Sequence, residues 1–367
     1  MRFRPRRFQI GAGLAAIFLA ASFGLGVADE TPASADPAPA EAEPAPLNPL
    51  LETCVAAQVP ETAALACTTA IESRQLQGEA LAGALFTRGM AQGRRGQLPA
   101  AINDFTAALT LTPDATDVLY ARGSAHAAIQ RHDLAIGDFS AILKIDPKDA
   151  DSLYRRAWSY TMLGRDKEAI ADLSAVIGEA GDDMDALMDR GGLNIRLGDF
   201  DAAIGDFSAI LKLDPKAAAA FYNRGRARAL QNDFAAAAKD FAAAQESRAD
   251  NPYAALRRYL ATARSGKAEE TLLSETIGRY PPEQWPLPIL ATLAGDMRES
   301  DLLASADLAD RNVTQRLTAE AHFYLGEAAL AKKDMKAAKA HFEAAAKGDR
   351  TIPEVIDAGW RLKQQPE

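Results

Sequence analysis

Small and apolar residues recur along this chain at a fixed interval of 34 residues. The block Ala101-Ile102-Asn103-Asp104-Phe105 is repeated, with substitutions but without insertions, in later blocks that begin at Ala135, Ala169, Ala203 and Ala237. A glycine or alanine precedes each block by twelve residues, at Gly89, Gly123, Ala157, Gly191 and Gly225. The apolar residues around these positions follow helical spacing. A constant period of this length indicates stacked helical hairpins rather than a globular enzyme fold.

Glycine and proline mark the expected ends of these helices. The first helix of a unit should end at Gly96, Gly164 and Gly198, and the second should end before Pro113, Pro147 and Pro215. The recurring small residues would let two antiparallel helices approach closely. Each hairpin would leave apolar faces uncovered unless neighbouring hairpins stacked on it. We therefore expect an all-α solenoid with an extended surface suited to holding another chain.

This unit resembles the tetratricopeptide repeat. The resemblance rests on the period, the Gly/Ala pair, the aromatic residue of the Phe105 series and the closing dipeptides Asp146-Pro147 and Asp214-Pro215. Residues 82–251 hold five good units, and 48–81 reads as a modified first unit, so we expect the array over 48–251. The resemblance implies an α-solenoid of tetratricopeptide-type helical hairpins with an irregular helical C-terminal cap.

The regular pattern weakens after residue 251. Four prolines between Tyr280 and Pro288 should interrupt the stack, so we expect a degenerate helical segment at 252–318. A final repeat, one residue out of phase at Gly326, and a capping helix are expected over 319–367. We expect this part to fold back as a cap with Trp285 pinning its turn. Its predicted core residues are Leu302, Leu303, Phe323, Tyr324 and Leu325.

Residues 280–350 also resemble new-lipoprotein-I-type envelope adaptors in the order of their motifs. These include Trp285-Pro286, the stretch from Glu320 to Gly326 and Phe342-Glu343-Ala344-Ala345. Members of that family are tetratricopeptide proteins that hold peptidoglycan hydrolases and a protease together. This chain lacks the family's lipid-bearing cysteine, which puts anchoring to the outer membrane in doubt.

The N-terminal segment has the pattern of an export signal. Basic residues from Arg2 to Arg7 precede an apolar stretch from Ile10 to Leu25, and small residues lead to Ala28. We expect a signal peptide over 1–28, cleaved near Ala28, and a Pro/Ala-rich disordered linker over 29–47. The predicted location is therefore periplasmic, and the alternative is an uncleaved N-terminal membrane anchor.

The two cysteines, Cys54 and Cys67, are thirteen residues apart. This separation is close to the spacing of the small residues that face one another in each hairpin. In an exported protein it predicts a disulfide that closes the first hairpin. The alternative is a pair of buried free thiols.

The sequence offers no recognisable catalytic or metal-binding motif. The four histidines lack metal-ligand spacing, and no phosphate loop or nucleophile elbow is present. The Arg88 and Asp104 series recur in the array, which indicates a charge ladder rather than a catalytic pair. We predict no cofactor, and the formal net charge of −9 disfavours nucleic acid as a partner.

The resemblance implies that first-helix residues beside the core line the concave face of the array. We expect a partner to bind there, because aromatic and arginine side chains often anchor recognition surfaces. The alternative is that several of them only fill the seam between helices. The predicted partner-binding residues are Phe86, Met90, Arg94, Tyr120, Tyr154, Trp158, Met162, Met188, Arg196, Tyr222, Asn223 and Arg226.

These observations favour a non-catalytic periplasmic scaffold or adaptor. It would hold a peptide or protein segment in its concave groove, in cell-envelope or peptidoglycan-hydrolase regulation. Two alternatives stay open. One is a structural subunit of an envelope complex that acts through its convex face or its cap, and the other is an enzyme with a site in 252–318. A homodimer is compatible with the sequence.

Overall fold

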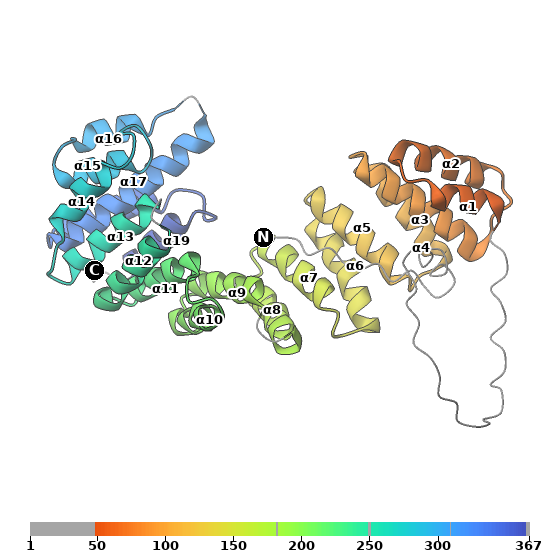
Figure 1. The fold of residues 1–367 in the computed structure, drawn as a ribbon, viewed down its shortest axis with the longest axis horizontal. Coiled ribbons are helices and arrows are strands. Elements are labelled where there is room, and N and C mark those ends of the chain that lie inside the picture. The colour runs from red at the N-terminus through yellow and green to blue at the C-terminus, as the bar shows by residue number, and fades with distance from the viewer. Residues whose placement is uncertain (1–47, 181–182, 249–250, 309, 365–367) are drawn as a thin grey trace, which may run out of the picture. The chain divides into compact units, whose positions relative to one another are not determined.

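A computed structural model describes residues 48–180, 183–248, 251–308 and 310–364 (Figure 1). The predicted signal peptide and linker lie outside these residues. The described residues form 19 helices and no strand, which confirms the all-α prediction. None of these helices is both long enough and apolar enough to cross a membrane. The chain divides into two compact units, Met1–Glu179 and Ala180–Glu367.

The first unit is a run of helical hairpins. Consecutive helices pack against one another, and the first helices α3, α5 and α7 also touch in order, so equivalent positions in successive repeats lie next to each other. The helices are α1 (Pro49–Ala56), α2 (Pro60–Glu72), α3 (Gly78–Arg94), α4 (Leu98–Leu111), α5 (Thr116–Ala128), α6 (His132–Ile145), α7 (Ala150–Met162) and α8 (Asp166–Ala180).

The second unit begins with the same hairpins and then departs from them. Its regular helices are α9 (Met184–Leu197), α10 (Phe200–Leu213), α11 (Ala218–Leu230), α12 (Phe234–Ser247) and α13 (Pro252–Arg264). Three short helices follow, namely α14 (Glu270–Ile277), α15 (Leu287–Ala294) and α16 (Glu299–Ser305). The unit closes with α17 (Arg311–Ala331), α18 (Met335–Ala345) and α19 (Pro353–Gln364). The predicted boundary at 318/319 falls inside α17.

The turn within each hairpin uses one left-handed residue at the 34-residue interval. These residues have φ between 62° and 83° and are Gly96, Gln130, Gly164, Gly198, Asn232 and Gly266. Glycine tolerates this conformation best, which explains why the sequence signal was visible at only some of the turns. Pro113, Pro147 and Pro215 follow the second helices as predicted.

Close helix contact within a hairpin depends on a small residue facing an aromatic ring. A Cβ atom added at Gly191 would lie 2.7 Å from the Phe207 ring, and Gly89, Gly225 and Gly326 are as tightly packed against Phe105, Phe241 and Phe342. The third repeat has Ala157 opposite Leu173 instead, so a larger residue on one helix accompanies a smaller one on the other. The packing therefore constrains both positions together.

The predicted charge ladder is present in both units. In five repeats an arginine of the first helix binds an aspartate of the second helix through two nitrogens, with Nη2···Oδ1 distances of 2.6–2.7 Å. The pairs are Arg88–Asp104, Arg122–Asp138, Arg156–Asp172, Arg190–Asp206 and Arg224–Asp240. The aspartates are buried, and the hydrogen bond to Asp104 raises the pKa of Arg88. Arg122, Arg156 and Arg224 also donate to a Thr or Ser of the preceding repeat, so the ladder links repeats as well as helices.

Cys54 of α1 and Cys67 of α2 form the predicted disulfide. Both cysteines are fully buried in a small core with Leu51, Ala70 and Leu76. The disulfide joins the two helices of the first hairpin, so it stabilises the N-terminal end of the described array.

The core of the second unit contains the residues predicted for the core of the C-terminal part. Leu302, Phe323, Tyr324 and Leu325 are buried, and Leu303 packs beside them half-buried. Trp285 donates from Nε1 to Glu320 of α17, at 2.8 Å, which ties the proline-rich turn to the long helix.

Candidate functional site

The first unit holds seven of the predicted partner-binding residues, and their exposure differs. Phe86, Met90, Tyr154 and Trp158 are half-buried, whereas Arg94 and Met162 are exposed. Phe86, Met90 and Trp158 pack with one side on the main core of this unit. We call Phe86, Met90, Tyr154, Trp158 and Met162 the aromatic row. It is carried by α3 and α7, which flank α5.

Tyr120 does not lie on an open surface as predicted, and it follows the alternative of filling the seam between helices. Its side chain is only 6% exposed and packs edge-on against Phe139 at 5.8 Å between ring centroids. Its hydroxyl accepts a hydrogen bond from Arg155 Nε at 2.5 Å. Tyr120 therefore fills the seam between α5 and α6. Gly123 of α5 has no side chain, which lets Phe139 of α6 pack inward against α5 and against the Tyr120 ring.

The remaining predicted residues belong to the second unit. Met188, Arg196, Tyr222 and Asn223 are half-buried, and the Asn223 side chain donates to Ala219 O at 3.0 Å. Arg226 is only 7% exposed, which contradicts its placement on an open surface. The reason is that α19 lies against α11 and covers it, although more than 120 residues separate the two helices in sequence (Figure 1).

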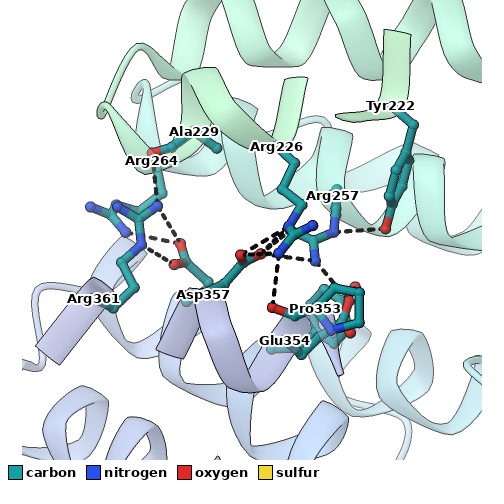
Figure 2. Close-up of polar contacts among 11 residues, drawn as sticks. Tyr222, Arg226, Ala229, Arg257, Arg264, Pro353, Glu354, Asp357 and Arg361 are labelled. Carbon is teal, nitrogen blue, oxygen red and sulfur yellow. Dashed lines mark hydrogen bonds and ion pairs between the residues drawn. The ribbon is translucent and has the colours of Figure 1, made fainter. Parts of the chain in front are cut away.

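A cluster of buried charges joins α19 to the repeat helices (Figure 2). Asp357 of α19 is fully buried and accepts from Arg226, with Nη2···Oδ1 at 2.7 Å, and from Arg257 Nη1 at 3.3 Å. Glu354, one turn earlier, accepts from Arg257 Nη2 at 2.7 Å. Arg257 also donates from Nε to the Tyr222 hydroxyl at 2.8 Å. Two carboxylates three residues apart on one helix thus meet two arginines on two other helices.

Electrostatics keep these arginines charged although they are buried. Burial opposes the ionisation of Arg226, but the neighbouring Asp357 outweighs it and leaves the pKa of Arg226 raised. The pKa of Arg257 is also well above its usual value despite burial, through Tyr222, Tyr324 and the two carboxylates. Because a buried ion is tolerated only when it is paired, the cluster requires α19 or an equivalent source of negative charge.

A second group of charges lies at the C-terminal end of α19. Arg361 binds Glu327 of α17 and donates from Nη2 to Ala229 O of α11 at 2.9 Å. Arg264 of α13 binds Glu327 from the other side at 3.0 Å, and burial lowers the pKa of Arg264. A cavity of about 30 Å³, roughly one water molecule in size, lies among these groups and the rings of Phe234, Phe241 and Phe323.

Trp360 anchors α19 at the turn between α9 and α10. Its ring contacts Phe200 edge-on, with 5.6 Å between centroids. Gly198, the left-handed residue of this turn, has no side chain, and a Cβ there would lie 2.3 Å from the Trp360 ring. The indole therefore occupies space that exists only because residue 198 is glycine.

Family models for the tetratricopeptide repeat match residues 86–150, 188–252 and 301–351, and another model of this repeat matches 151–182. Together these segments cover more than half of the chain. The chain belongs to the tetratricopeptide repeat family. Such repeats form protein–protein interaction scaffolds, and they are typically non-catalytic.

Solved tetratricopeptide structures share the fold at low sequence identity. A repeat protein from Parabacteroides merdae ATCC 43184 gives a TM-score of 0.50 at 18% identity, over 77% of this chain and 99% of that one. YrrB, a TPR protein with an unusual peptide-binding site, gives 0.46 at 23% identity, over 52% and 96%. PilW, a type IV pilus biogenesis factor, gives 0.43 at 18% identity, over 54% and 91%. A comparison with curated proteins finds no match.

Sequence reasoning missed the cluster around α19. It predicted a capping helix but assigned no role to Glu354, Asp357, Trp360 or Arg361. Their spacing of three or four residues puts them near one face of a helix. Three charged residues therefore share the face of Val355 and Ala358, and this combination is the signal that could have identified the cluster. Arg257 stands at the repeat position that Arg155 occupies three repeats earlier, and both arginines donate from Nε to the hydroxyl of a tyrosine in the preceding repeat.

Two histidines lie side by side on α17 and α18. The Nδ1 atoms of His322 and His341 are 3.1 Å apart, so one ring donates to the other. Burial and then His341 lower the pKa of His322. Over the described residues, no group of three or more His, Cys, Asp and Glu is placed to hold a metal ion.

Proposed function

We propose that this chain is an exported, non-catalytic scaffold that binds a protein or peptide segment on the aromatic row of its first unit. The observation that carries this proposal is the half-exposed state of Phe86, Met90, Tyr154 and Trp158, together with Met162, whose side chain is 53% exposed. Large apolar side chains fixed by a core on one side and open on the other are typical anchors of recognition surfaces.

The partner segment should be apolar or aromatic with negative charge near one end. Arg94 at the end of α3 is exposed. It adds positive charge beside the row. It would pair with a carboxylate of the partner, while the row itself would bury apolar side chains.

Export and a role in the cell envelope are part of the proposal. The signal-like pattern over residues 1–28 supports export, and so does the Cys54–Cys67 disulfide, because disulfides persist in oxidising compartments. The resemblance of residues 280–350 to envelope adaptors supports a role in peptidoglycan-hydrolase regulation. Mass measurement of the mature protein would test export, and a mature chain that still carries residues 1–28 would favour the membrane-anchored alternative.

Site-specific photocrosslinking tests the binding surface. A benzophenone amino acid at Met162 should give adducts with an envelope protein in intact cells, and Trp158→Ala should abolish them. The matched control is the same probe at Leu134 of α6, which is 51% exposed on a second helix of the same unit. Adducts at Leu134 but not at Met162 would contradict the proposal and favour a subunit that acts through its convex face.

A further inference from the structure

The contact of α19 with the repeat helices α11 and α13 is made mainly by charged and polar groups. On the repeat side, the charged groups that face Glu354 and Asp357 are the cations Arg226 and Arg257. Without α19, this face would present two arginines without their carboxylate partners, beside the Tyr222 hydroxyl that accepts from Arg257. A face of this kind binds carboxylates through charge-assisted hydrogen bonds.

The contact also contains an anchor of the kind found at protein interfaces. Trp360 sits over Gly198, against Phe200, while the two carboxylates lie three and six residues before it on the same helix. Interface energy is usually concentrated in a few such residues, with tryptophan and arginine the most frequent among them.

α19 follows the last hairpin of the unit and has a single covalent connection to it. It is the last described helix, is joined to α18 by residues 346–352, and packs on α17 and α18 as well as on α11. Its fully buried apolar side chains are only Val355 and Ala358, whereas Glu354, Asp357 and Arg361 are buried charges. Buried ion pairs contribute little net stability because desolvation offsets their attraction.

We propose that the face formed by Gly198, Tyr222, Arg226 and Arg257 is a binding site for an acidic amphipathic helix, and that α19 occupies it until a partner helix displaces it. The partner helix carries two carboxylates three residues apart and an aromatic residue three positions further on, as Glu354, Asp357 and Trp360 do. This inference extends the proposed scaffold function. It uses residues of the second unit only, so its test can fail while the aromatic row still binds its partner.

The test uses the full chain and a labelled synthetic peptide of residues 351–364. The double variant Asp357→Asn, Trp360→Ala loosens α19, and fluorescence anisotropy should then show at least about tenfold tighter peptide binding than to the unaltered chain. A peptide carrying Glu354→Gln and Asp357→Asn should bind the loosened chain about tenfold or more weakly.

Two further variants of the loosened chain locate the site. Arg257→Gln should remove peptide binding, whereas Lys212→Gln, which removes an exposed cation from α10 of the same unit, should leave it unchanged. Equal loss in both variants would show non-specific attraction and overturn the proposal. So would a loosened chain that keeps its far-UV circular dichroism but does not bind the peptide. A dimer seen by light scattering would indicate that two copies exchange α19. The occupant of the site would then be a second copy rather than a partner helix, and the proposal would be wrong in this form.

Hydrogen exchange of the unaltered chain provides a measurement that needs no variant. The amides of α19 should exchange at least about tenfold faster than those of α17 and α18, since local opening requires less free energy than unfolding of the unit. If α19 exchanged only together with α17 and α18, it would be a fixed part of the fold and the proposal would be wrong.

Discussion

Replacing Gly191 by alanine tests whether the recurring glycine is fixed by packing against the facing ring. Gly191 lies on α9, and an added Cβ would be 2.7 Å from two atoms of the Phe207 ring, well inside van der Waals contact. The ring is fully buried, so it cannot rotate into solvent. Forcing an extra methyl group into a packed core costs about 1–3 kcal/mol.

A control for helix propensity is available at the next residue. Gly192 lies on the same helix, and a Cβ there would meet nothing within 4 Å. Gly192→Ala should raise the free energy of unfolding by about 0.5–1 kcal/mol, because alanine is the better helix former. Gly191→Ala gains the same propensity term and still should lower the free energy of unfolding by about 0.5–2 kcal/mol after the packing cost.

The chain itself suggests the compensating change. Its third repeat has Ala157 opposite Leu173, so Phe207→Leu should relieve the clash of Gly191→Ala. In a double-mutant cycle followed by urea unfolding and circular dichroism, the coupling between the two substitutions should be favourable by about 1–2 kcal/mol. A Gly191→Ala variant as stable as Gly192→Ala, or a coupling below about 0.3 kcal/mol, would refute the reasoning.

Three further predictions concern charge, redox state and pH. Arg122→Met leaves the buried Asp138 without its bidentate partner and should lower the free energy of unfolding by about 2–4 kcal/mol. A change below about 0.5 kcal/mol in urea unfolding would show that the pair is as weak as a surface salt bridge. The disulfide closes a short loop, so a Cys54→Ala, Cys67→Ala chain should lose about 3 kcal/mol, and unreduced digests of the native protein should contain the two cysteines in one linked peptide. Burial lowers the pKa of His322 in the folded state, so the unfolded chain takes up a proton at a higher pH than the folded chain does. The free energy of unfolding should therefore fall as pH drops below the ordinary histidine pKa, and it should level off below the pKa of the folded state. His322→Gln should reduce this pH dependence in thermal melts, and an unchanged profile would contradict the assignment.

The sequence alone determined the repeat, its packing and its N-terminal staple. Periodicity identified the Gly89 and Ala101 series as positions of close helix contact, twelve residues apart within one hairpin, whereas the packing of the Phe105 series over the glycines came from the structure. The same local geometry predicted the Cys54–Cys67 disulfide and the Arg122–Asp138 series. Contacts within a hairpin are set by helix spacing and turn length, and both can be read from sequence.

The tertiary structure alone decided which of the predicted surface residues are covered. Tyr120 is buried because Phe139 packs toward Gly123, and Arg226 is buried because α19 returns to α11. The hydrogen bonds that hold α19 on α11 and α13 join residues separated by 97 to 134 positions. Such contacts depend on how far the stacked repeats curve, which is a sum of small rotations at every interface, and no local pattern in the sequence encodes that sum.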